Sequence, residues 1–192
     1  MKTAMKKSTI ILIAVGAVLA ILLIWGIASY NGLVNAEVAV DTAESDLGVY
    51  LQRRADLIPN LVSTVKGYTE HEEQVYTDLA NARAKLAGST NAEDKFEANE
   101  ALSSAISRLH VVVENYPELK ANTQFTALMD ELSGAENRIA TARKDYNTAV
   151  KEFNTKQRRF PNSIIAGLFG FEEATMYEAS EGAQNVPSVD FN

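Results

Sequence analysis

Cysteine is absent from this chain of 192 residues, and histidine occurs only twice. The lack of cysteine excludes disulfides, thiol catalysis, zinc–thiolate sites and a bacterial lipoprotein anchor. Helix breakers are also few, with 4 prolines and 10 glycines. Because the remainder is rich in Ala, Leu, Glu, Asn and Lys, the composition predicts an all-α protein.

Basic residues are scarce beyond the first thirty positions. Three of the 18 Lys and Arg residues lie before residue 31, so 15 basic and 25 acidic residues follow it, a net charge of −10. A surface of that sign repels polyanions, which excludes nucleic acid as a partner.

One long run carries no charge at all. Residues 10–29 read IILIAVGAVLAILLIWGIAS. Twenty helical residues cover about 30 Å, the thickness of a bilayer's hydrocarbon core, so the run predicts a transmembrane helix that contacts lipid. A cleavable signal peptide and a buried core helix are the alternatives. The run is longer than a usual signal core, and it has no polar face.

The flanking charges predict an orientation. Lys2, Lys6 and Lys7 precede the run, and the next basic residue is Arg53. The positive-inside rule therefore places the N-terminus in the cytoplasm and the rest of the chain outside it.

Apolar residues at heptad spacing predict further helices that pack in a coiled-coil-like bundle. We expect a first helix up to Lys66, a second from a capping box at residues 69–72, a third over 92–115 and a fourth over 118–158. The predicted seams are Leu47, Leu51, Ile58, Leu61 and Val65; Val75, Leu79 and Leu86; Phe96, Leu102, Ile106, Leu109 and Val113; and Phe125, Met129, Leu132, Ile139, Tyr146, Val150 and Phe153.

Two breakers leave the first helix open to alternatives. Pro59 predicts a kink, or a true break with Asp56 capping a new helix. Gly67 predicts a helix end in the left-handed conformation. However, the seam continues in register beyond Gly67, so one long kinked helix is the alternative. The fold is therefore an N-terminal transmembrane helix followed by an antiparallel up-down bundle of four helices, or of three long, kinked ones.

The chain divides into five predicted segments. They are a short basic segment (1–9), the transmembrane helix (10–29), the bundle (30–160), an apolar closing segment packed on the bundle or the membrane (161–177), and an acidic tail expected to be disordered (178–192).

Three charged residues interrupt the seams. Arg54, Glu136 and Arg143 stand at apolar positions of the first and fourth helices. Burying an unpaired charge costs several kcal/mol, so these side chains should pair or reach the rim. We expect an Arg54–Glu136 contact that sets the register of the two helices. In the alternative, the seam is loose and all three reach water.

No motif for catalysis or metal binding is present. His71 lies among glutamates, but neither H-E-x-x-H nor E-x-x-H occurs, and His110 reads as a surface or boundary residue. We therefore predict no catalytic residue, no metal and no cofactor.

Two strings resemble the LemA family of bacterial membrane proteins. They are QRRADLIPNLV at residues 52–62 and ENYPELKA at 114–121, and the resemblance extends over residues 30–177. It implies a single membrane helix carrying a helical bundle at the bacterial cytoplasmic (inner) membrane, with no known reaction. Relatives occur in systems such as magnetosome formation.

The preferred function is a non-enzymatic scaffold or interaction module that binds other membrane or envelope proteins, or itself. The alternatives are an accessory subunit of a membrane protease or transporter and, last, a metal-dependent hydrolase. Residues 164–171 are a candidate surface. The candidate structural or interaction residues are Arg53, Arg54, Asp56, Pro59, Asn60, Glu136, Arg143, Tyr146 and Asn147.

Overall fold

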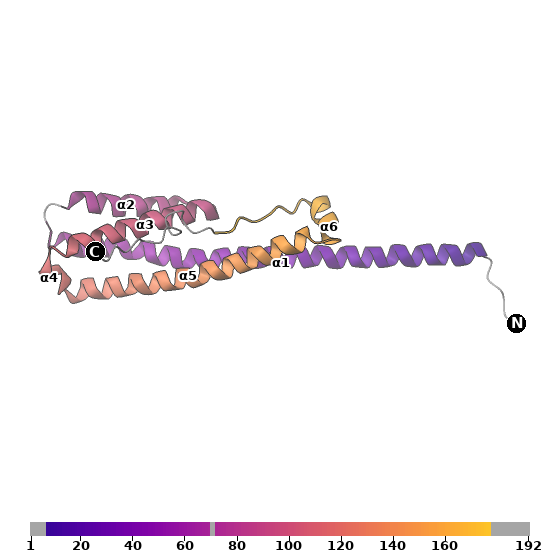
Figure 1. Ribbon diagram of the computed structural model, residues 1–192, viewed down its shortest axis with the longest axis horizontal. Coiled ribbons are helices and arrows are strands. Elements are labelled where there is room, and N and C mark those ends of the chain that lie inside the picture. The colour runs from indigo at the N-terminus through magenta and orange to yellow at the C-terminus, as the bar shows by residue number, and fades with distance from the viewer. Residues whose placement is uncertain (1–6, 70–71, 178–192) are drawn as a thin grey trace, which may run out of the picture. The chain divides into compact units, whose positions relative to one another are not determined.

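The computed structural model describes residues 7–69 and 72–177, and that part of the chain is helical without any strand (Figure 1). Most of the predicted basic segment, His71 and the tail expected from residue 178 onward lie outside the described residues. The helices are α1 (Lys7–Lys66), α2 (Glu73–Gly88), α3 (Ala92–Val113), α4 (Pro117–Lys120), α5 (Thr123–Arg158) and α6 (Asn162–Phe169). The all-α prediction is confirmed.

The described chain forms two compact units. One comprises residues 7–41 and 149–174, which are the first part of α1, the end of α5, and α6. The other comprises residues 42–148 and 175–177, in which the rest of α1, α2, α3 and most of α5 form a bundle with each long helix antiparallel to the next (Figure 1). We call the first the anchor unit and the second the bundle unit.

The predicted seams supply the core of the bundle unit. Heptad residues of α1, α2, α3 and α5 point inward because their spacing keeps one stripe of each helix facing its neighbours. The most deeply buried of these side chains are Leu47, Ile58, Leu61, Val65, Leu79, Leu102, Leu109 and Ile139. Leu119 of α4, outside the predicted seams, is buried in the same core. In the anchor unit, Leu33, Val150 and Phe153 are buried.

The first helix ends at Lys66, as predicted, so the alternative of one helix continuing through Gly67 is wrong. The predicted left-handed glycine is also wrong, because Gly170 is the one residue in the described chain with positive φ. The Gly67 amide instead donates to Thr64 O at 3.3 Å, and the Tyr68 amide donates to Val65 O at 2.9 Å. These tight turns satisfy the last carbonyls without a left-handed residue.

The predicted capping box at residues 69–72 is wrong. The hydroxyl of Thr69 donates to Val65 O at 3.2 Å and contacts the Tyr76 hydroxyl. Because this hydroxyl serves the end of α1, it does not cap α2, which begins at Glu73 with no side-chain cap.

The predicted fourth helix is split in two. Pro117 opens the short helix α4, and α5 begins only at Thr123. Asn122 separates them, because its side-chain oxygen accepts a hydrogen bond from the Phe125 amide at 2.9 Å. That is the bond of an N-cap, a role for which asparagine is favoured.

Helix α1 runs through Pro59 unbroken, so the alternative of a new helix capped by Asp56 is wrong. Proline has no N–H, which leaves the carbonyl four residues earlier without its helical donor. That carbonyl belongs to Ala55, and Arg83 of α2 donates its Nε–H to it at 3.2 Å. A side chain from the next helix therefore replaces the missing backbone bond.

Because Arg83 replaces the donor that Pro59 lacks, substitutions of these two residues should have non-additive effects on the free energy of unfolding. Arg83→Met keeps most of the side-chain stem but leaves Ala55 O unpaired, which should lower the free energy of unfolding by about 1–2 kcal/mol. In a Pro59→Ala background the restored backbone N–H at position 59 donates to Ala55 O, so Arg83→Met should then cost almost nothing. Denaturant unfolding of the detergent-solubilised chain measures both effects. Equal costs in the two backgrounds would contradict the proposed exchange of donors.

Candidate functional site

Arg54 is the one charged residue of the described chain that is buried, with 4 % of its surface exposed. Its Nη1 donates to Asn99 Oδ1 at 2.7 Å and to Ser103 Oγ at 3.0 Å, both on α3. The same nitrogen lies 2.7 Å from Glu136 Oε2 on α5. One guanidinium therefore joins three helices of the bundle unit, and the predicted Arg54–Glu136 contact is present.

Opposing electrostatic effects act on the charge of Arg54. Burial lowers the pKa of Arg54, the charge of Glu136 opposes that effect, and the nearby Arg143 lowers the pKa further. Since Asn99 and Ser103 take the two Nη1 hydrogens, Glu136 contributes its charge rather than an aligned hydrogen bond. Its side chain is 39 % exposed as a whole, but the Oε2 atom that faces Arg54 is buried.

Sequence reasoning missed Asn99 and Ser103 as partners of Arg54. A usable signal was present for Asn99, which stands one heptad before Ile106 and two before Val113. Asn99 is 0 % exposed. Asparagine in register with a predicted seam therefore marked a buried polar position opposite the arginine.

Arg143, the second basic residue predicted in a seam, lies against Tyr177 of the closing segment. Its guanidinium carbon is 4.4 Å from the ring centre, which is cation–π geometry. The Tyr177 ring also meets Phe96 edge-on at 4.4 Å, and its hydroxyl donates to Glu100 at 3.0 Å. Burial raises the pKa of Tyr177, and Arg143 partly offsets this.

Tyr146 and Asn147 hold the backbone of the same closing segment. The Tyr146 hydroxyl donates to Thr175 O at 2.8 Å. The Asn147 amide donates to Tyr177 O at 2.9 Å and accepts from the Tyr177 N–H at 2.8 Å. In the structure these two candidate interaction residues therefore bind this chain itself.

The other candidates lie on the outer side of α1. Arg53, Asp56, Pro59 and Asn60 are all exposed. Arg53 pairs with Glu131 at 3.4 Å, and both side chains are more than half exposed. No burial fixes these side chains, so the face can present both charges and amides to a partner.

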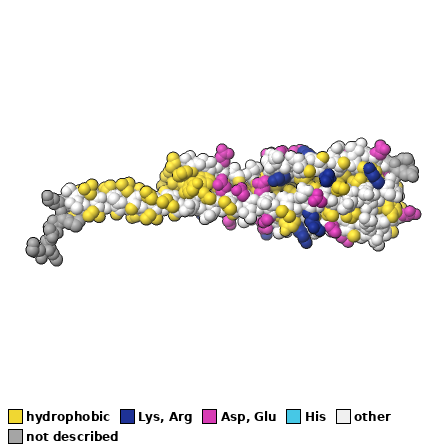
Figure 2. Space-filling view, turned by 180° about the vertical axis from the view of Figure 1, so that it is seen from behind, with side chains coloured by type: hydrophobic (Ala, Val, Ile, Leu, Met, Phe, Trp, Pro, Cys, Tyr) yellow, Lys and Arg dark blue, Asp and Glu magenta, His cyan; other side chains and the backbone are white. Residues whose placement is uncertain are grey.

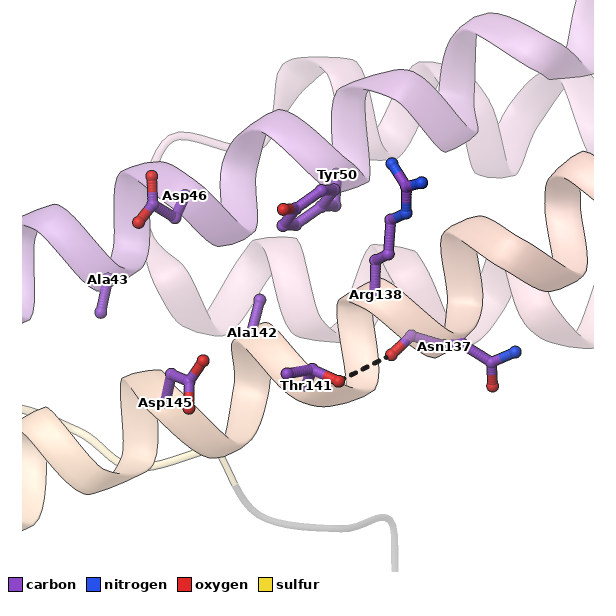
Figure 3. Close-up of a pocket in the computed structure, with 8 residues that line it drawn as sticks. All are labelled: Ala43, Asp46, Tyr50, Asn137, Arg138, Thr141, Ala142 and Asp145. Atoms are coloured by element: carbon purple, nitrogen blue, oxygen red, sulfur yellow. Dashed lines mark hydrogen bonds between the residues drawn. The ribbon is translucent and has the colours of Figure 1, made fainter.

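A shallow groove of about 480 Å³ lies between α1 and α5 in the bundle unit (Figure 3). Asp46 and Asp145 stand at one end, Arg138 and Asn137 stand at the other, and the Tyr50 ring lies between them (Figure 3). Ala43, Thr141 and Ala142 complete the lining. An open surface with both signs of charge and a tyrosine suits protein recognition better than enclosure of a small molecule.

No catalytic constellation emerges from the residues that the structure describes. Within residues 7–69 and 72–177, no three His, Asp or Glu side chains come together as metal ligands. His110 is exposed on α3. The predicted lack of a metal, a cofactor and a catalytic residue remains a prediction.

Comparison with known proteins finds related sequences. The model of the LemA family matches residues 43–191. Magnetosome protein MamQ 2 of Paramagnetospirillum magneticum is 26% identical over 175 residues, which cover 78% of this chain and 64% of that protein. Protein LemA of Metamycoplasma hominis is 23% identical over 152 residues, 79% of this chain and 69% of that protein. The chain thus spans a little less than two thirds of the magnetosome protein's length.

The ion pair predicts a charge-specific loss of stability. Glu136→Gln keeps the side-chain shape but removes the countercharge of a buried guanidinium. We expect a loss of about 1–2 kcal/mol, less than for a fully buried pair because Glu136 is partly exposed. Denaturant unfolding provides the measurement.

Two matched variants isolate the cause. Glu131→Gln makes the same change on the same helix at an exposed pair and should be nearly neutral. Glu136→Gln in an Arg54→Met background should also be nearly neutral, because no buried charge remains. If the loss persists without Arg54, the pair does not hold the helices.

Proposed function

The chain belongs to the LemA family, and on that premise we propose that it is a non-enzymatic scaffold or interaction module at the bacterial cytoplasmic membrane. The single observation that carries the proposal is the exposure of the apolar run in α1. The large apolar side chains from Ile10 to Ile24 are 51–72 % exposed, and the most apolar stretch of α1 has no buried residue. Figure 2 shows hydrophobic side chains along this run, with no Lys, Arg, Asp or Glu among them.

The exposed apolar surface of this run is unfavourable in water. An exposed apolar patch beyond a few hundred Å² is unusual on a soluble monomer, whereas lipid covers an uncharged helix of this length without unpaired backbone groups. Tyr30 lies just beyond the run, where tyrosine favours the membrane–water boundary. With the lysines at the N-terminus, this supports a single-pass anchor, a cytoplasmic N-terminus and an extracytoplasmic bundle unit.

The surface of the bundle unit supports binding rather than catalysis. Two features support this, namely the open groove beside Tyr50 and the exposed charged face around Arg53 and Asn60. Several relatives are named as magnetosome proteins. For this chain we propose only that it joins proteins of the membrane or envelope, including further copies of itself.

Anchoring predicts how the protein partitions. Alkaline carbonate, which strips peripheral proteins, should leave the full chain in the membrane pellet. A variant that lacks residues 1–29 should move to the supernatant and remain helical by circular dichroism. Release of the full chain, or a mature N-terminus near Ser29, would contradict the anchor.

Crosslinking in intact membranes tests the scaffold. Because the chain has no cysteine, Asn60→Cys places a single photoreactive label on the proposed face. Ladders of self-adducts, or adducts with several membrane proteins, are expected. Val111→Cys, on α3 and 71 % exposed, is the matched control and should give few adducts. One dominant foreign adduct with a protease or transporter subunit would favour an accessory role instead.

A further inference from the structure

Helix α6 packs against the end of the apolar run in the anchor unit. Ser29 Oγ donates to Asn162 Oδ1 at 2.6 Å. The Ile165 Cδ1 atom lies 4.0 Å from where a Cβ on Gly26 would be, and the Tyr30 and Phe169 ring centres are 4.8 Å apart. This short helix is thus fixed beside the segment that enters the membrane.

The contacts use one face of α6 and leave the other uncovered. Asn162, Ile165 and Phe169 recur at helical spacing toward α1, as does the buried Ala166. Ile164 and Leu168 are four residues apart, so they share the opposite face. They are 57 % and 74 % exposed, and the preceding Phe160 is 81 % exposed.

Exposed apolar side chains of α1 flank the point where α6 packs on it. Ile24 and Ile27, on either side of Gly26, are 68 % and 54 % exposed. The described part of α6 carries no charged residue. Whatever medium surrounds the end of the span therefore also meets the outer face of α6.

The chain positions give the depth of this face. At about 1.5 Å per residue, Gly26 is about 4.5 Å inside the end of the run at Ser29, and Gly32 is about 4.5 Å outside it. Lys156 of α5 lies over Gly32, with Nζ 3.2 Å from where a Cβ would be. The ammonium group of Lys156 thus lies just beyond the end of the run, while Ile165 of α6 lies against the run itself. A long basic side chain can keep its charged tip at the headgroups while an apolar side chain beside it meets the acyl chains.

We propose that α6 is a second membrane contact, which lies in the bilayer interface with Phe160, Ile164 and Leu168 in the acyl boundary. The partner is phospholipid, because α6 packs on the end of the proposed span, where the neighbouring side chains of α1 are also apolar and exposed. The inference rests on the proposed anchoring. It adds a contact that fixes the anchor unit at one depth, as a span alone does not.

Spin labelling of the full chain in phosphatidylcholine nanodiscs tests the contact. The lack of native cysteine allows single labels at Leu168→Cys and, independently, at Ile164→Cys. Both labels should collide with oxygen several-fold more, relative to a water-soluble nickel chelate, than a label at Val111→Cys. Leu22→Cys, inside the span, gives the lipid reference, and unchanged circular dichroism shows that each variant is folded.

The outcomes separate the inference from the anchor on which it rests. Nickel-accessible labels at residues 164 and 168 with an oxygen-accessible label at 22 would overturn the interfacial helix and leave the anchor standing. Nickel-accessible labels at all three would overturn both. Exclusion of both reagents at residues 164 and 168 would show that protein, such as a second copy, covers the face, and would overturn lipid as the partner.

Discussion

One helix, α1, has to satisfy two different surroundings, and the rest of the structure depends on how its residues divide between them. From Ile10 to Ile24 its large apolar side chains are exposed, so this part has no protein neighbours to pack on. From Leu47 onward the residues at heptad spacing fall on a single stripe and are buried in the core of the bundle unit, whereas Val49, off that stripe, is 63 % exposed. The change from apolar on every side to apolar on one side is the change from a membrane helix to a bundle helix.

Within the bundle unit, polar groups link particular positions of neighbouring helices. An apolar seam alone tolerates shifts in register, because leucines exchange places at little cost. Arg54 does not tolerate them, since its guanidinium must meet Asn99, Ser103 and Glu136 together. Arg83 adds a second fixed point at the carbonyl released by Pro59. We regard both as devices for register rather than large sources of stability, because buried ion pairs gain little over apolar packing.

The sequence predicted correctly those features that depend on the spacing of residues along a single helix. The seams, the helix end at Lys66 and the pairing of Arg54 with Glu136 followed from spacing and from the cost of an unpaired charge. Asn122 was missed because a polar residue within a long helical pattern resembles a solvated position until its side chain is seen to cap α5. Thr69 was wrongly predicted as a cap. Its hydroxyl could either cap α2 or bind the last carbonyls of α1, and the contact with Tyr76 favours the second.

The contacts of the closing segment could not be predicted from its own sequence, because side chains of α5 bind its backbone rather than its side chains. In the bundle unit Asn147 pairs with both backbone groups of Tyr177, and in the anchor unit Asn154 pairs likewise with those of Ala174. Seven helical residues and three extended residues each advance by about 10 Å, so asparagines one heptad apart suit backbone groups three residues apart. Held through its backbone, the segment needs few apolar side chains to stay in place. The exposed side chains of α6 are therefore not needed to hold this segment in place, which leaves them free for the contact with lipid that we propose.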